Sequence, residues 1–288
     1  FLTSISKNAI ALVEGRMVHS HRFGVKGYVS GTGRRSMWES YSVGTSQISP
    51  QFWINPSDLN DTSKDRVSVM RVGFCDIAGQ TNERSLTAAL IPPGVACGNK
   101  VPTITFPEDT SEDRLFVWLA IANSFAFDWM LRRILTTTVN YFLLQSLPMP
   151  KLTKNGLPWK KLASCAAELR RLDSLGTESD VFEQTAIIRA VIDAEVAIAY
   201  GLGLNEMKLM FADFLILDRG QPALPGEQKS FITRDLVMLE FTKRIGACNR
   251  ELSHRVMEAK KMGAVAYVPL TRALTRLENK KVSGESHG

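Results

Sequence analysis

The sequence predicts an α+β protein in which a β-rich part comes first and a helical part follows. Up to about residue 108 the chain is rich in Gly, Ser, Thr and aromatic residues, and its short β-type runs end at Gly and Pro clusters. From residue 157 onward, apolar residues recur at helical spacing. We therefore expect a mixed, β-rich domain over residues 1–150 and an α-helical domain over residues 151–288, with a disordered polar tail after about Glu278.

Three runs in the first part have the composition of strands. They cover residues 66–75, 87–91 and 101–106, and each is dominated by β-branched or other apolar residues. A Pro92-Pro93-Gly94 turn signal follows the second run.

The character of the chain changes at Thr110. Either Thr110 or Ser111 can cap a helix whose first turn carries Glu112 and Asp113. Apolar residues continue at helical spacing, so we expect one helix that runs to about Ile134. Its aromatic residues are expected in the core rather than on a binding surface: Trp118, Phe125 and Phe127.

Two long helices are expected next. The first covers residues 157–175, with Pro158 tolerated in its first turn. The second covers residues 181–200 and stops at Gly201, with Asp193 and Glu195 turned outward. Its expected core positions are Ile187, Ile188, Val191, Ile192, Ala194, Val196 and Ala199.

The last third of the chain predicts shorter helices. Asn205 can cap a helix that ends near Phe214, and residues 218–229 read as a loop because they hold two prolines and two glycines. A further helix opens at Thr233 and runs to about Ile245, and its pattern can extend to Lys261.

Composition narrows the function classes. There are 35 Lys and Arg against 29 Asp and Glu, a net charge of +6, which suits a polyanionic partner without requiring one.

The four cysteines are far apart and form no CxxC pair, so they are expected to be reduced thiols in the cytoplasm. No apolar run has the length of a membrane span and no signal peptide is seen, so no membrane partner is expected. Since the chain begins at Phe1, we expect it to be part of a longer protein.

Catalytic and cofactor signatures are missing from the sequence. There is no Asn/Asp-Pro-Pro-aromatic loop, no GxSxG elbow and no Cys–His pair. Gly31-Thr32-Gly33 is not followed by the helix that a nucleotide-binding loop requires. His19 and His21 alternate on an expected strand, but two histidines without a third ligand make a poor metal site, so we expect a DNA contact or a surface pair. We therefore predict no catalytic residue, no metal and no cofactor in this chain.

Four stretches, in order along the chain, resemble the region after the catalytic domain in large adenine-specific DNA methyltransferases. Residues 13–38 (VEGRMVHSHRFGVKGYVSGTGRRSMW) are similar to that family's "EGRM.HQFDHR" motif with its following Gly/Arg turn and Trp, although Ser20 and the order His21-Arg22-Phe23 depart from it. Residues 71–92 are similar to "R…IA..TNERT…A.iiP" and residues 119–150 to "lNS..fdf..R......ln.f.l..lP.P". Residues 191–214 are similar to "lDa.VA.lYGL…e…il..F".

The resembling proteins are type IIG restriction–modification enzymes, phage-exclusion methylases and proteins with a TaqI-like C-terminal specificity domain. The resemblance implies that residues 1–150 are a DNA target-recognition domain and residues 151–288 a helical scaffold. Double-stranded DNA and the methyltransferase catalytic domain of the parent protein would be the partners, in a bacterial or archaeal cytoplasm. The parent would use S-adenosylmethionine to methylate a flipped adenine at N6, and this chain alone would not be the enzyme.

Reading duplex DNA needs cations for phosphates and fork-shaped or amide side chains for base edges. Residues 16–38 supply such cations, and their glycines allow a close approach. The turn at residues 81–84 either faces DNA or is internal, with Arg84 paired to Glu83 or Asp76; Arg132 and Arg133 contact DNA or serve the helix dipole. The candidate DNA-binding residues are Arg16, His19, His21, Arg22, Lys26, Arg34, Arg35, Thr81, Asn82, Arg84, Arg132 and Arg133.

Two alternatives stay open. A specificity subunit like those of type I systems would also bind DNA, but the sequence has one recognition unit and no long heptad helix. A protein-interaction or assembly module would carry its basic surface incidentally, and its binding would not depend on salt.

Overall fold

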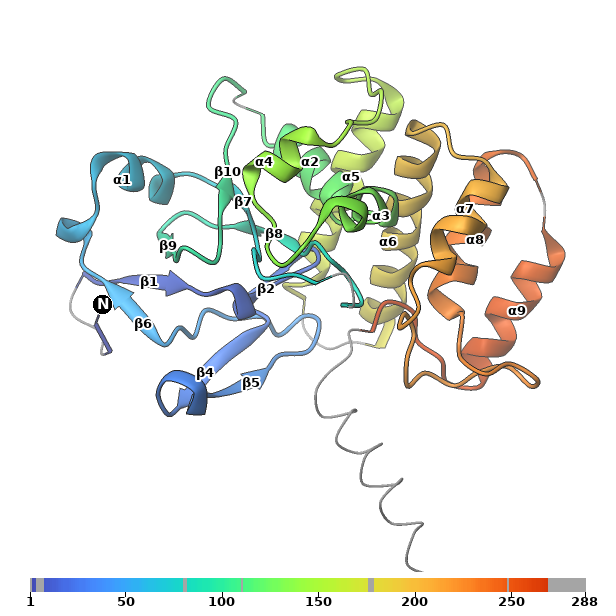
Figure 1. Ribbon diagram of the computed structural model, residues 1–288, viewed down its shortest axis with the longest axis horizontal. Helices are drawn as coiled ribbons and strands as arrows, with labels where there is room; N and C mark the ends of the chain where they lie inside the picture. Colours follow the sequence, from blue (N-terminus) through green and yellow to red (C-terminus); the bar gives the residue numbers. More distant parts are fainter. Residues whose placement is uncertain are drawn as a thin grey trace, which may run out of the picture. The chain divides into compact units, whose positions relative to one another are not determined.

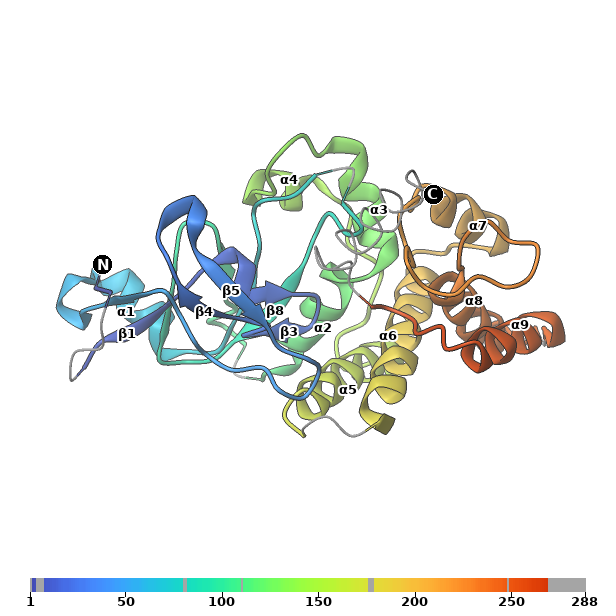
Figure 2. The same ribbon diagram turned by 90° about the horizontal axis from the view of Figure 1, so that it is seen from below.

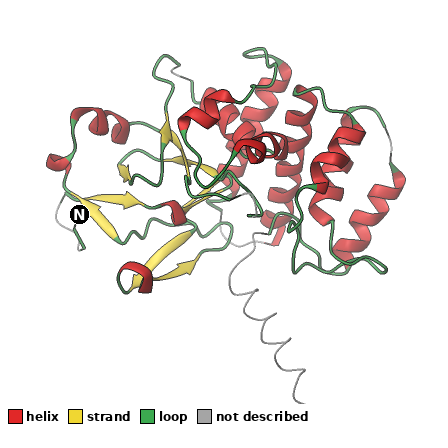
Figure 3. Cartoon of the chain, viewed as in Figure 1, coloured by secondary structure: helices red, strands yellow, loops and turns green. Residues whose placement is uncertain are grey.

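The computed structural model describes residues 2–3, 8–79, 82–109, 111–175, 179–247 and 249–268. The protein is a mixed α+β chain that divides into two compact units, Phe1–Gly201 and Leu202–Gly288. Within the described residues, strands occur in the first unit and the second unit is helical (Figure 3). The expected boundary near residue 150 lies inside the first unit.

In the described residues of the first unit, the strands form four small sheets (Figure 1). In one sheet, β1 lies between an antiparallel β6 and a parallel β9; in a second, β7 lies between β10 and β8, both antiparallel. Two hairpins, β2–β3 and β4–β5, make the other sheets. The bounds are β1 Ile10–Val13, β2 Val18–His19, β3 Arg22–Phe23, β4 Lys26–Ser30, β5 Met37–Ser40, β6 Phe52–Ile54, β7 Arg71–Phe74, β8 Ala88–Ile91, β9 Val95–Cys97 and β10 Thr103–Ile104.

The strand predictions hold in part. Residues 87–91 contain β8, and Gly94 turns the chain with a φ of +83°, as the Pro-Pro-Gly signal indicates. Residues 101–106 form only the two-residue β10. The run 66–75 was wrong at its start, because residues 66–68 end the helix α1 (Asp61–Ser68). Asn60 caps that helix by accepting a hydrogen bond from the Ser63 amide at 2.8 Å, and this local signal outweighs the β-branched residues.

Helices cover one side of the second sheet. Here α2 (Asp113–Ala122) packs against β7 and β8 and also against α5 (Leu157–Leu172) and α6 (Ser179–Ala199). The apolar core beneath the strands includes Val13, Met17, Ile91 and Val95, with Trp38 and Trp53 packed on its margin. The helix α4 (Tyr141–Ser146) follows α3 (Phe125–Ile134) and contacts it.

The single helix expected up to Ile134 is wrong. It is two helices, α2 and α3, whose axes differ by 61°. Ser124 has an extended backbone and caps α3 by accepting from the Phe127 amide, so the helix restarts there. The cap of α2 is Glu112, without a side-chain capping bond, rather than Ser111; Thr110 lies outside the described residues. Phe125 and Phe127 are buried in the core, and Trp118 is half-buried against Phe127, as expected.

The predictions for α5 and α6 agree with the structure within a few residues, and Gly201 ends α6 with a φ of +76°. Two predictions for side chains of α6 are wrong. Asp193 is buried rather than turned outward, because its carboxylate accepts a hydrogen bond from the first amide of α3, at Phe125, at 2.7 Å. Conversely Ile187, an expected core residue, is exposed.

The second unit contains α7 (Leu204–Ala212), α8 (Ile232–Arg244) and α9 (Arg250–Lys261), with a loop over residues 218–229 as predicted. The cap of α7 is Gly203, not Asn205, and its amide donates to the Glu206 carboxylate at 3.0 Å. The extension of α8 to Lys261 is wrong, since Gly246 has a φ of +73° and Asn249 caps α9 as a separate helix.

No single helix in the described part of the chain has the length and apolar character needed to cross a membrane; only α2 and α3 taken together, bent as they are, meet that test.

Candidate nucleic-acid interface

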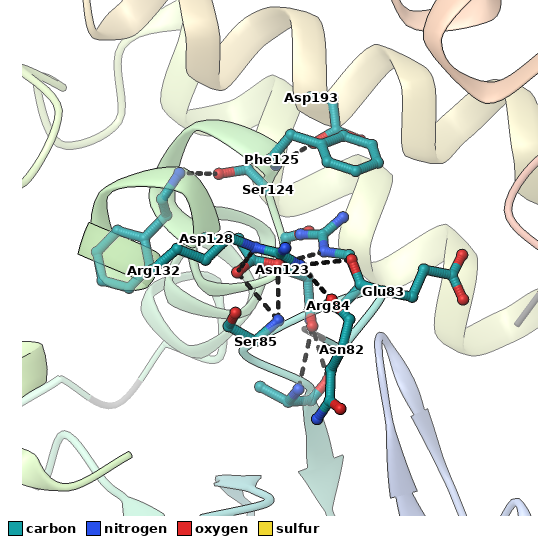
Figure 4. A network of polar contacts seen from close by, with 12 residues as sticks. Asn82, Glu83, Arg84, Ser85, Asn123, Ser124, Phe125, Asp128, Arg132 and Asp193 are labelled. Carbon is teal, nitrogen blue, oxygen red and sulfur yellow. Dashed lines mark hydrogen bonds and ion pairs between the residues drawn. The ribbon is translucent and has the colours of Figure 1, made fainter. Parts of the chain in front are cut away.

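The predicted cations of the first unit fall into two groups, buried and exposed. Arg84 and Arg132 belong to the buried group and lie around the carboxylate of Asp128 (Figure 4). Nε of Arg84 donates to Asp128 at 2.7 Å and Nε of Arg132 donates to it at 3.3 Å. The amide of Ser85 is a third donor to the same carboxylate, at 3.0 Å. Asp128 is fully buried, so this network stabilises the fold.

Each guanidinium also holds backbone carbonyls. Nη2 of Arg84 donates to the carbonyl of Asn123 at 2.5 Å, and its plane lies over the Phe125 ring at 4.1 Å. Nη2 of Arg132 donates to the carbonyls of Asn82 and Glu83 at 2.7 and 2.6 Å. Of the two interpretations of the turn at residues 81–84, the structure therefore places Arg84 internally, with Asp128 as its partner instead of Glu83 or Asp76. Thr81 lies outside the described residues, and Asn82 is exposed.

Asn123 ties the break between α2 and α3 to strand β8. Its amide nitrogen donates to the carbonyl of Ala88 at 2.9 Å, and its amide oxygen accepts from the Ala88 nitrogen at 3.0 Å. Asn123 thus makes with Ala88 the pair of hydrogen bonds that a neighbouring strand would make. Its side chain takes the place of a strand partner at this position of β8.

The histidines do not form the surface pair that their alternation indicates. The tight β2–β3 hairpin turns at Ser20 and His21, both buried, and His21 has a φ of +63°. Its amide donates to the carbonyl of Ala88 at 2.9 Å, which fixes the turn against β8. Burial, with Arg189 and Arg84 nearby, lowers the pKa of His21 well below its ordinary value; burial and the cations led by Arg189 lower the pKa of His19 to about 3. Both side chains are therefore neutral at pH 7.

Arg22 is also engaged within the protein. Its Nε donates to Asp173 at the end of α5 at 2.8 Å, and its Nη2 donates to the carbonyl of Ser42 at 2.6 Å and the hydroxyl of Ser46 at 2.8 Å. Asp173 accepts from the amide of Gly44 as well, at 3.1 Å. Arg22 thus holds the loop after β5 against α5 and is not available at the surface.

The exposed group gathers on and beside the β4–β5 hairpin. Lys26 begins β4 and is exposed, and the chain turns through residues 31–36 at the tip. Arg34 and Arg35 lie on that tip and are exposed, and their side chains form no ion pair or hydrogen bond with another described residue. Figure 2 shows the hairpin extending from the rest of the first unit, apart from α3.

Arg16 joins this surface from the short helix η1 (Gly15–Met17). Its guanidinium lies 4.7 Å from the centre of the Trp38 ring and its Nη1 is 3.5 Å from the hydroxyl of Ser36. An ion pair of 3.9 Å with Glu14 further limits its orientation, and the side chain is 44% exposed. Tyr28, paired with Trp38 across the hairpin, packs edge-on against that ring at 5.8 Å. Sequence reasoning singled out Arg16 but missed the aromatic pair, although a Gly-rich turn between Tyr28 and Trp38 is a hairpin signal.

Of the two predicted cations of α3, Arg132 is buried and Arg133 is exposed. The guanidinium of Arg133 lies 4.7 Å from the centre of the Trp129 ring.

The described part of the first unit also holds a cavity of about 470 Å³ near α1 and α2. Its charged lining residues are Asp65, Arg66, Asp109 and Glu112, an acidic balance that suits a polyanion poorly.

Within the described residues there is no group of three or more His, Cys, Asp or Glu side chains arranged to hold a metal ion. Cys75, Cys97 and Cys165 are free thiols, and burial raises the pKa of Cys75 and Cys97, which makes these two poor nucleophiles. Cys248 lies outside the described residues. Chemically, the surface around the β4–β5 hairpin offers exposed guanidinium groups.

No known family model and no curated protein matches the sequence.

Proposed function

We propose that this chain recognises double-stranded DNA by sequence, as the specificity module of a site-specific N6-adenine DNA methyltransferase from a restriction–modification or phage-defence system. The observation that carries the DNA part is the β4–β5 hairpin, with Arg34 and Arg35 exposed at its tip and Arg16 anchored on Trp38 beside it. Guanidinium groups in this setting match phosphates and base edges. The methyltransferase context rests on the four stretches of family resemblance.

In this proposal the β-rich residues 1–150 contact DNA, and the helical residues 151–288 brace them against the catalytic domain of the parent protein. S-adenosylmethionine and the reacting groups belong to that domain, so the chain is not an enzyme by itself. Its setting is the cytoplasm of a bacterial or archaeal cell. DNA-binding residues are expected at Arg16, Lys26, Arg34, Arg35 and, further away, Arg133.

The network around Asp128 supports this assignment by elimination. Arg84 and Arg132 have the residue type and sequence context of DNA contacts, but Nε and Nη2 of Arg84 donate to buried acceptors, and Arg132 donates to Asp128 and to the carbonyls of Asn82 and Glu83. Exposing them to a phosphate would break an ion pair in a buried site, at a cost of about 3–5 kcal/mol. The proposed DNA-binding surface therefore does not include Arg84, Arg132, Arg22, the half-buried His19 or the buried His21.

The test is binding of the 288-residue chain to a pool of short DNA duplexes with a randomised centre, at two salt concentrations, with sequencing of the bound fraction. Enrichment of a short motif that contains adenine, with weaker binding at high salt, is the expected result. Binding that ignores salt would favour the assembly-module function, and no binding at either concentration would refute the proposal. Two separate motifs in one site would instead favour a type I-like specificity subunit.

A pair of matched variants locates the surface. The double variant Arg34→Ala/Arg35→Ala removes two cations from the tip, so it should weaken binding and make log affinity fall less steeply with log salt. The control Lys64→Ala/Arg171→Ala removes two exposed cations from α1 and α5 with the same change in net charge. The control should leave the slope unchanged, and an equal effect of both variants would mean that only overall charge matters.

A further inference from the structure

The arginines around the β4–β5 hairpin differ in how their side chains are held, and this difference has functional meaning. Arg16 is restrained by an aromatic ring, a hydroxyl and a carboxylate, whereas Arg34 and Arg35 have no side-chain partner among the described residues. Arg16 also lies beside the strands instead of at the tip. The restrained Arg16, at the side of the hairpin, is placed to contact a phosphate of the DNA backbone. Arg34 and Arg35, at the tip, are placed to contact the base edges inside a groove.

The hairpin tip is narrow and open. Gly31 and Gly33 have φ values of +85° and +54°, and residues 31–35 are all exposed. An added Cβ at Gly33 would meet no atom within 4 Å. The major groove of B-DNA, about 12 Å wide, admits a two-stranded β-ribbon and presents a distinct donor and acceptor pattern for each base pair, whereas the pattern in the minor groove is degenerate. A two-stranded hairpin with an exposed tip is therefore suited to the major groove.

Two large apolar side chains flank the arginines. Val29, at the bulge of β4, is 54% exposed, and Met37, at the start of β5, is 59% exposed. Neither side chain belongs to the apolar cluster around Val13 and Ile91. The methyl group of thymine is an apolar feature of base edges that is present only in the major groove. Val29 and Met37 are suited to contact it.

From these observations we infer that Arg34 and Arg35 read guanine in the major groove, with Val29 and Met37 beside them on neighbouring thymine methyls, while Arg16 contacts a phosphate and fixes how deeply the hairpin enters. This inference rests on the proposed function. It assigns the specificity of the hairpin to residues 29–37 and its register on the duplex to Arg16.

Modified bases test the groove directly. The duplex enriched from the randomised pool is remade with 7-deazaguanine, which lacks the N7 acceptor of the major groove, or with inosine, which lacks only the minor-groove amino group. Loss of a bidentate contact to guanine should weaken binding roughly 5- to 150-fold with 7-deazaguanine, while inosine changes it little. A larger effect of inosine than of 7-deazaguanine, or an enriched motif without guanine, would overturn the inference.

Lysine variants test the division of roles. Arg34→Lys/Arg35→Lys keeps both charges but removes the two-pronged donors, so the salt dependence should persist while the 7-deazaguanine penalty shrinks and the motif relaxes. Arg16→Lys should weaken binding to all duplexes alike and keep the motif. If Arg34→Ala/Arg35→Ala still selects the same motif as the unmodified chain, the tip does not read bases. If the unmodified chain binds no duplex, the proposed function itself is refuted.

Discussion

The carboxylate of Asp128 lies 2.7 Å from Nε of Arg84, and both side chains are buried. Asp128 is also the acceptor for Arg132 and for the Ser85 amide, so one residue of α3 organises the turn that precedes β8. This arrangement explains why two arginines that the sequence predicts as DNA contacts form internal contacts instead.

Replacing Asp128 with asparagine should destabilise the protein by about 3–5 kcal/mol. The variant keeps the size of the side chain but removes the buried negative charge that Arg84 and Arg132 share. The free energy of unfolding in urea measures the effect. The control Glu168→Gln breaks the exposed pair with Arg171 on α5, where a loss below about 1 kcal/mol is expected. Equal losses in both variants would show that the Asp128 network is not a buried ionic site.

Asn123→Ala should cost about 1–3 kcal/mol, because it leaves the N–H of Ala88 unpaired in a buried strand, while the C=O of Ala88 keeps the hydrogen bond from the His21 amide. Asn60→Ala on the exposed helix α1 is the matched change and removes a single capping bond, worth about 1 kcal/mol. Unfolding in urea again compares the two. A smaller loss at Asn123 than at Asn60 would contradict the view that its side chain replaces a strand neighbour.

Stability should fall as the pH drops below about 6.5. The unfolded chain takes up protons on His19 and His21 there, but in the folded state the pKa of His19 is lowered to about 3 and that of His21 is also lowered, so acidification favours unfolding. His19 alone accounts for up to about 2 kcal/mol between about pH 7.5 and pH 5. Urea unfolding across that interval measures it. In the variant His19→Gln/His21→Asn the slope should flatten, whereas an unchanged slope would assign the effect to other groups.

Gly31→Ala should distort the tip of the β4–β5 hairpin more than Gly33→Ala does. Both residues have positive φ, which strains any added side chain, but a Cβ at Gly31 would also lie 2.5 Å from the carbonyl oxygen of Arg35, while one at Gly33 has open space. We expect the Gly31 variant to weaken DNA binding by about tenfold and to unfold at a lower urea concentration than the Gly33 variant, because a strained backbone costs about 1–3 kcal/mol. Binding that responds equally to both variants would mean that tip geometry does not matter.

Local signals predict some elements of this fold well. The bounds of α5 and α6 follow from apolar spacing, from Pro158 in a first turn and from Gly201 at an end, all of which act within a few residues. The break between α2 and α3 could not be predicted in this way. Asn123 interrupts the helical pattern to bond Ala88, which is 35 residues earlier, and no local spacing reveals that partner.

The candidate site shows the same division. Arg34 and Arg84 are indistinguishable as residue types in basic, Gly- or Asn-containing turns, yet one is in solvent and the other is 9% exposed. The difference is set by Asp128, which lies 44 residues after Arg84 in the sequence. Exposure therefore decides which arginines can reach a partner, and exposure depends on contacts between distant parts of the chain. Whether Arg34 and Arg35 bind DNA stays a prediction.

The separation between the hairpin tip and the interior has an evolutionary consequence. Residues 29–37 lie outside the apolar cluster formed by residues such as Val13 and Ile91, which the hairpin meets only through Trp38. Mutations in this stretch can accumulate without changing the packing of the apolar core or the ion pairs of Asp128 with Arg84 and Arg132. A lineage under pressure from changing invaders could thus exchange one short loop for another, and acquire a new preference, while every other part of the molecule is inherited intact.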